Sequence, residues 1–244
     1  MASALDSRKN GDAIRGFTLQ GIEKTTSMAK RKKAKGRAQP LHATAEKLLD
    51  VVERLCAQNG LEAVSIRDVA KAAGVSLSVI YHHYKSRNDL LKAAMNRRFQ
   101  ELLRMRGPLF AELEKTSKPD LDKLLYAIIA PVTLLRMSRP DGWIVGQFLA
   151  QIMLSPLPDV KNEVDASVKH LRDLAHLMQR ALPHLNLKDI CWRLHFTIGI
   201  ERMTQWDSDR LRIMSNGICN PEDVNETISR AVAYAKAAFL APPA

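Results

Sequence analysis

The stretch from Ser65 to Arg87 constrains the fold more than any other part of this chain, because it predicts two short helices joined by a tight turn. Ser65 and Asp68 have the spacing of a capping box, in which each side chain accepts a hydrogen bond from the other residue's backbone amide, so we expect a helix to begin here. Gly74 can adopt the left-handed backbone conformation that ends a helix, and Ser76 suits the cap of the next one.

The second of these helices has an apolar side and a polar, aromatic side. Val79, Ile80 and Tyr84 are expected to face the core. The outward side carries the remaining residues: Leu77, Ser78, Tyr81, His82, His83 and Lys85. A further capping box, Ser86 with Asp89, predicts that another helix follows. Two helices separated by a short turn that contains glycine form the helix-turn-helix arrangement, whose second helix enters the major groove of DNA.

Matching residues of a known pattern lie in register across this region: Gly60, Ser65 to Ala70, Ala73 to Ser76, Ile80, Tyr81, His83, Tyr84, Ser86, Arg87, Leu90 and Leu91. With them, residues 43–98 resemble the DNA-binding domain of the tetracycline-repressor (TetR) family of transcriptional regulators. The resemblance implies an all-α fold, in which an N-terminal three-helix helix-turn-helix domain precedes a helical ligand-binding and dimerisation domain. The chain departs from the commonest family residues at Ser78, Tyr84 and Arg87.

By this resemblance the third helix reads DNA, and nine residues are expected at the DNA-facing surface: Ser65, Arg67, Ser76, Leu77, Ser78, Tyr81, His83, Lys85 and Arg87. Ser65 and Ser76 also serve as expected helix caps. Leu77 can contact a thymine methyl group, so we expect some preference for A·T pairs in each half-site. One such unit buries little surface, and a dimer on a palindromic double-stranded operator is therefore expected.

The positive charge of the chain is concentrated near its N-terminus. Residues 1–40 carry a net charge of +7 and residues 41–98 carry +3, out of +11 in total. A polyanionic partner for this end is the simplest implication. Residues 1–40 are expected to be a basic, disordered arm that adds salt-dependent DNA affinity, through the cluster from Lys30 to Arg37. Met28 stands just before this cluster, and we hypothesise that translation begins there.

The rest of the chain, residues 99–244, has helical periodicity interrupted by proline and glycine. After a helix from Asn88 that Pro108 is expected to break, we expect helices near residues 109–116, 120–137, 141–154, 159–182, 187–206 and 221–240, the last of them capped by Asn220. By the resemblance, residues 187–240 form a homodimer interface. A small apolar or amphipathic effector is expected in a pocket lined by Trp143, Phe148, Met178, His195 and Phe196, although the same side chains also suit a core or an interface.

Several classes of protein are not supported. The longest apolar run has 12 residues, from Leu124 to Leu135, against the ~20 needed to cross a bilayer, so we expect a cytoplasmic protein without a membrane span. Three widely spaced cysteines suggest neither a disulfide framework nor a metal site. Known catalytic motifs are missing from the sequence, and we expect no enzyme activity, no cofactor and no metal.

The division that we expect is an N-terminal arm at 1–40, a helix-turn-helix domain at 41–98 and an effector-binding and dimerisation domain at 99–244. The leading function is a sequence-specific transcriptional regulator, more specifically a repressor that the effector releases from DNA. Two alternatives stay open: a nonspecific basic DNA-binding protein that works through its arm, and an all-helical ligand carrier or enzyme.

Overall fold

The computed structural model describes residues 39–137, 141–167, 171–206 and 208–243, and in these ranges it contains helices and loops without a strand. This confirms the all-α prediction. The helices are α2 (Gln39–Asn59), α3 (Ile66–Ala73), α4 (Leu77–His83), α5 (Arg87–Glu114), α6 (Leu121–Met137), α7 (Gly142–Leu154), α8 (Pro158–Ser167), α9 (Leu171–Ala181), α10 (Leu187–Trp206), α11 (Ser208–Met214) and α12 (Val224–Leu240). Among the helices described, none is both long and apolar enough to cross a membrane. The predicted arm, Met28 included, lies almost wholly outside the described residues.

The turn between α3 and α4 forms as its sequence predicts. Ser65 Oγ accepts a hydrogen bond from the Asp68 amide at 3.3 Å, and Asp68 Oδ2 accepts one from the Ser65 amide at 2.9 Å. Gly74 ends α3 with φ of +66°, a value that L-residues with a side chain rarely adopt. Ser76 occupies the cap position of α4, but its hydroxyl pairs with the Ser78 hydroxyl at 2.7 Å and makes no bond to a backbone amide.

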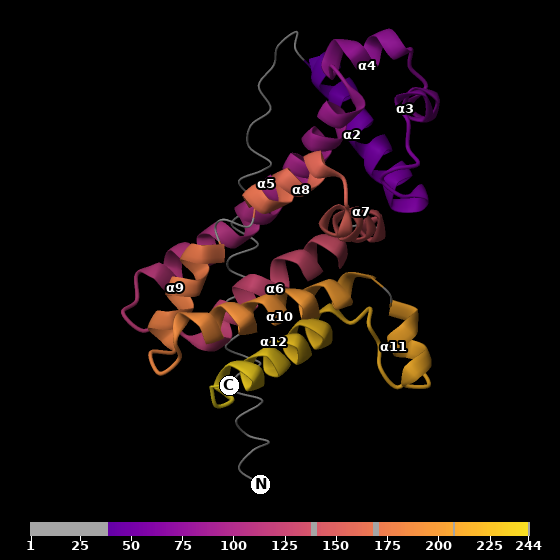
Figure 1. The fold of residues 1–244 in the computed structure, drawn as a ribbon. Helices are drawn as coiled ribbons and strands as arrows, with labels where there is room; N and C mark the ends of the chain where they lie inside the picture. The colour runs from indigo at the N-terminus through magenta and orange to yellow at the C-terminus, as the bar shows by residue number, and fades with distance from the viewer. Residues whose placement is uncertain (1–38, 138–140, 168–170, 207, 244) are drawn as a thin grey trace.

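The long helix α5 corrects the prediction that Pro108 breaks the chain into two helices. The helix continues through Pro108 to Glu114, and no separate helix covers 109–116. A proline inside a helix removes an amide donor, clashes with the carbonyl four residues back and crowds the Cβ and amide of the preceding residue. Gly107 precedes Pro108 and has no Cβ, which relieves part of the last of these clashes. As a result, α5 runs from the helix-turn-helix end deep into the rest of the molecule (Figure 1).

Two large hydrophobic cores hold the molecule together. The first packs α2 to α5 around Leu48, Ile80 and Leu90, and it also contains Phe148 and Ile152 of α7. The second packs α6 against α9, α10 and α12. The predicted boundary between residues 98 and 99 falls inside α5, so one continuous helix belongs to both parts.

The C-terminal helices differ from the predicted ones in two places. The helix expected at 159–182 is covered by α8 and α9, and its residues 168–170 lie outside the described residues. α12 begins at Val224 rather than near 221, because Asp223 is its cap and accepts a hydrogen bond from the Glu226 amide at 2.9 Å. Asn220 instead closes a turn in front of it, accepting a bond from the Asp223 amide. α11, which was not predicted, follows α10 in the chain and projects to one side of α10 and α12 (Figure 1).

Candidate nucleic-acid interface

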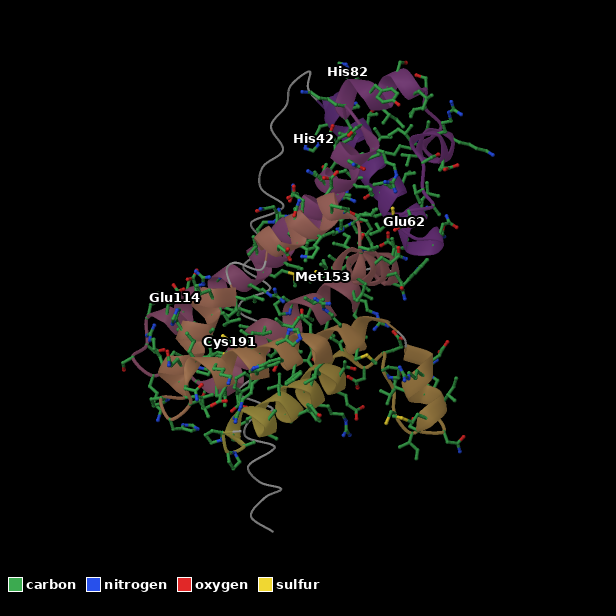
Figure 2. The ribbon with its side chains drawn as sticks, viewed as in Figure 1. His42, Glu62, His82, Glu114, Met153 and Cys191 are labelled. Atoms are coloured by element: carbon green, nitrogen blue, oxygen red, sulfur yellow. The ribbon has the colours of Figure 1, made fainter. Side chains whose placement is uncertain are left out.

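The exposed side of α4 lies at one extremity of the molecule (Figure 1). Ile80 points inward and is fully buried in the first core. On the opposite side Tyr81 is 52% exposed, and Leu77 and Ser78 are also exposed. His82 is also exposed and lies near the C-terminal end of α4 (Figure 2). A short helix anchored by one buried side chain therefore presents aromatic and polar groups to solvent.

The other expected DNA-facing residues surround this helix, with different degrees of exposure. Arg67 on α3 and Lys85 after α4 are both exposed. His83 is half-buried, and its ring packs edge-on against that of His82 and tilted against that of Tyr84. Tyr84 packs against the first core, as its inward assignment predicts. Ser65 and Ser76 immediately precede α3 and α4, where they occupy the N-cap positions of these helices.

Arg87 is placed differently from its expected DNA-facing position. Its Nε donates to the Val64 carbonyl at 2.5 Å, and its Nη2 donates to the Leu61 carbonyl. The side chain is half-buried and fastens the start of α5 to the loop between α2 and α3. The structural reason is that this loop exposes carbonyl groups that no helix satisfies, and a guanidinium can bind two of them at once.

We expect the substitution Arg87→Met to lower the free energy of unfolding by about 1.5–3 kcal/mol, because it removes charge-assisted hydrogen bonds to two carbonyls. Urea titration monitored by circular dichroism measures this change. Lys85→Met is the matched control, since Lys85 is exposed two residues earlier, and it should alter stability by less than about 0.5 kcal/mol. Equal losses in the two variants would contradict the structural role of Arg87.

A cavity of about 310 Å³ lies further along α5, between α5, α6, α7, α9 and α10. Its wall is mostly apolar, and Met153 of α7 lies on it, midway between the two ends of the molecule (Figure 2). The charged residues on the wall are Arg106 of α5, Glu163 of α8, and Glu201 and Arg202 of α10. Burial raises the pKa of Glu201, while Arg106 and Arg202 act in the opposite direction.

None of the five residues expected to bind an effector lines this cavity. Phe148 is buried in the first core and Met178 in the second. Trp143, His195 and Phe196 are exposed. The residues that do line the cavity on α5 were missed, although their helical spacing was a usable signal: Phe99, Leu102, Leu103, Arg106 and Phe110.

A second exposed surface, distant from α4, runs along α10 and α12, which lie side by side (Figure 1). On α10, Trp192, Phe196 and Met203 are large, exposed and spaced so that they share one face of the helix. The rings of Trp192 and Phe196 stack with centroids 5.7 Å apart. Tyr234 of α12 is also exposed. A soluble monomer rarely exposes so many large apolar side chains together.

These features define a helix-turn-helix DNA-binding protein with a helical C-terminal part that contains a cavity. Comparison with known families makes the class more specific. Residues 48–94 match the model of the bacterial regulatory proteins of the tetR family, and residues 126–238 match that of the tetracyclin repressor-like C-terminal domain. The chain belongs to the TetR family.

Individual relatives agree with this assignment. The HTH-type transcriptional regulator AcrR of Shigella flexneri is 42% identical over 52 residues, which are 21% of this chain and 24% of the relative. The HTH-type transcriptional repressor KstR2 of Rhodococcus jostii (strain RHA1) is 41% identical over 44 residues, 18% of this chain and 22% of the relative. The chain thus matches about a quarter of the length of these curated relatives.

Solved structures extend the likeness to most of the chain, at the level of the fold. A TetR-family transcriptional regulator from Bordetella parapertussis 12822 superposes with a TM-score of 0.58 and 18% sequence identity. The superposition covers 80% of this chain and 93% of that one.

Proposed function

We propose that this protein is a homodimeric repressor that binds a palindromic DNA operator in the cytoplasm and leaves it when a small molecule occupies the cavity beside α5. The observation that carries the proposal is the outward face of α4. It holds three exposed side chains suited to the major groove, Leu77, Ser78 and Tyr81, on a helix fixed from beneath by Ile80.

At the DNA, we assign base-edge contacts to Leu77 and Ser78, and contacts to phosphates or adjacent bases to Tyr81 and His83. Arg67 and Lys85 flank the helix and supply positive charge to the phosphate backbone. Ser65 and Ser76 are assigned phosphate contacts at the starts of α3 and α4, in exchange for or in addition to the hydrogen bonds that they make with Asp68 and Ser78. Arg87 is proposed to contribute to DNA binding indirectly. Its guanidinium binds the Leu61 and Val64 carbonyls and so fixes the position of α5.

The second copy is proposed to pack against α10 and α12. The exposed stripe of Trp192, Phe196 and Met203 would be covered by the same stripe of the partner, as a two-fold interface requires. Residues 187–240 thus keep their predicted role. His195 and Phe196, expected at first in an effector pocket, fit this interface better, because both are exposed and their rings are 5.8 Å apart on the outer face of α10.

Effector and DNA are proposed to communicate through two helices that line the cavity and also enter the first core, α5 and α7. The two sides of α7 show this most directly. One side of this helix, at Leu149 and Met153, lines the cavity. The other side, at Phe148 and Ile152, is buried in the core of the helix-turn-helix end. A ligand that moves α7 must therefore repack the first core, and tightly packed cores respond to such movements as units.

The proposal is tested by selecting binding sites from random DNA duplexes with the full chain. We expect a palindrome, and we expect Tyr81→Ala to weaken binding to it about tenfold or more, because Tyr81 is at the centre of the exposed face of α4. Trp143→Ala is the matched control: Trp143 is 48% exposed, but it lies on α7, and its loss should leave operator affinity unchanged.

The alternative of a nonspecific basic DNA-binding protein predicts a different result. A nonspecific binder would enrich no DNA motif in the selection. Its binding would also disappear equally in the Tyr81→Ala and Trp143→Ala variants as the salt concentration rises, since phosphate contacts alone are involved. That outcome would overturn the repressor proposal.

A further inference from the structure

The polar end of the cavity is built around the side chain of Arg106. Its Nη2 donates to Glu201 Oε1 at 2.9 Å and to the Ile128 carbonyl at 3.0 Å. All three residues line the cavity. Arg106 Nε is enclosed by the protein and has no hydrogen-bond acceptor among the described residues. The side chain as a whole stays 14% exposed, so another part of the guanidinium can meet a ligand in the cavity. An additional acceptor for this guanidinium would offset part of the cost of its burial.

Among the described residues on this part of the wall, basic side chains outnumber acidic ones. Arg202 follows Glu201 on α10 and brings a second guanidinium to the cavity. The remaining carboxylate on the wall, Glu163, pairs with Lys92 on the outer side of α5 at 3.4 Å. The guanidinium groups of Arg106 and Arg202 therefore have one nearby carboxylate on the described wall, that of Glu201. Because the side chains of Arg106 and Glu201 are only 14% and 7% exposed, charges at this end of the cavity are screened less than charges on the surface, and an anion is attracted more strongly.

The other walls select for an apolar body. Phe99, Leu103 and Phe110 of α5 face Val132 of α6 and Ile198 of α10 across the cavity. The cavity volume is about 310 Å³, which favours a compact ligand. It is also at the small end of the usual range for ligand pockets.

We propose that the cavity takes a compact amphipathic carboxylic acid, whose carboxylate pairs with Arg106 and Arg202 and whose apolar body contacts the side chains of α5, α6 and α10. This inference rests on the proposed function, in that the acid is the effector. It goes further by assigning the chemical class of the ligand and the residues that recognise its charge.

Isothermal titration calorimetry on the full chain, with octanoate, 1-octanol and octylammonium as probes of equal chain length, tests the ligand class. We expect octanoate to bind at least tenfold more tightly than octanol, and octylammonium more weakly than either. Arg202→Gln should weaken octanoate binding by about tenfold to a hundredfold and leave octanol unchanged, as the loss of one charge-assisted contact predicts.

Glu201→Gln is the decisive variant, because it is expected to strengthen octanoate binding. The change removes the carboxylate that competes for Arg106, and misfolding cannot produce a gain of affinity. Equal binding of octanoate and octanol, preference for octylammonium, binding of none of the three, or weaker octanoate binding by Glu201→Gln would each overturn the ligand class.

Operator binding, measured in the same samples by fluorescence anisotropy, separates this inference from the proposed function. If the protein binds its operator and octanol releases it as well as octanoate, the ligand class is wrong and the repressor function stands. If the protein binds no operator at all, the proposed function fails, and with it the role of the acid as effector.

Discussion

Replacing Phe196 with glutamate is expected to convert the proposed dimer to a monomer and to weaken operator binding by about a hundredfold or more. Phe196 is 61% exposed and stacks on Trp192 in the middle of the apolar face of α10. In a two-fold interface the substitution buries two like charges without partners. Because two linked reading heads gain about 10²–10⁴ in avidity over one, loss of the dimer removes most of the affinity for a palindrome.

Size-exclusion chromatography with light scattering and anisotropy titration of operator DNA measure the two effects. Leu154→Glu is the matched control, since Leu154 is 59% exposed at the end of α7, away from the α10 and α12 face. It introduces the same charge at a similar exposure and should leave the mass and the DNA affinity unchanged. A Phe196→Glu protein that stays dimeric would show that the subunits meet through another surface.

The helix-turn-helix could be predicted because its signals are local. The Ser65 and Asp68 box, the left-handed Gly74 and the inward Ile80 all act within one or two helical turns. No knowledge of the rest of the fold is needed to interpret them. The prediction for Ser76 was right in position and wrong in its bond, because the neighbouring Ser78 hydroxyl competes for it at 2.7 Å.

Predictions from local sequence were wrong where a neighbouring residue, or a contact between residues distant in sequence, changed the local structure. Pro108 is normally a helix breaker, but Gly107 in front of it relieves part of the clash, and α5 continues. The sequence Asn220 to Asp223 contains two possible caps, and helix α12 starts at the second one, with the first used in a turn. Arg87 resembles a phosphate contact in sequence, and only the folded loop brings the Leu61 and Val64 carbonyls to it.

The cavity could not be located from sequence because its wall comes from segments as far apart as Asn96 and Arg202. Aromatic character was the basis for choosing Trp143, Phe148 and Phe196, but burial decides what such residues do. Phe148 fills the core behind the helix-turn-helix, and the other two are exposed. The charged pair Arg106 and Glu201 is separated by 95 positions, and no sequence spacing predicts that contact.

Replacing Glu53 with glutamine is expected to lower the free energy of unfolding by about 3–5 kcal/mol, a large part of the roughly 5–15 kcal/mol typical of a whole domain. Glu53 of α2 is only 1% exposed. Its carboxylate pairs with Arg97 at 2.8 Å and with Arg98 at 2.6 Å. Arg98 is itself buried, and without Glu53 its remaining carboxylate partner is Glu101, at 2.6 Å and partly exposed. The substitution therefore removes the most deeply buried of its counter-charges.

Asp50→Asn provides the control, because it makes the same chemical change to another partner of Arg97. Asp50 pairs with Arg97 at 2.9 Å, but its side chain is 57% exposed, so the substitution should cost no more than about 1 kcal/mol. Urea or thermal unfolding compares the two variants directly. Similar losses would mean that water already screens the Glu53 pairs and that burial is not what makes them strong.

The position of the Glu53 ion pairs connects the stability of this network to the proposed function. Glu53 fixes α2 to α5 at Arg98, which lies between Asn96 and Phe99, two residues with which α5 lines the cavity. A weakened network would let the helix-turn-helix end move without a corresponding movement of α5 at the cavity. We therefore expect Glu53→Gln, studied at a temperature where it remains folded, to retain ligand binding but to lose most of the ligand's effect on operator affinity. If α7 alone carries the signal, the variant will keep that effect in full.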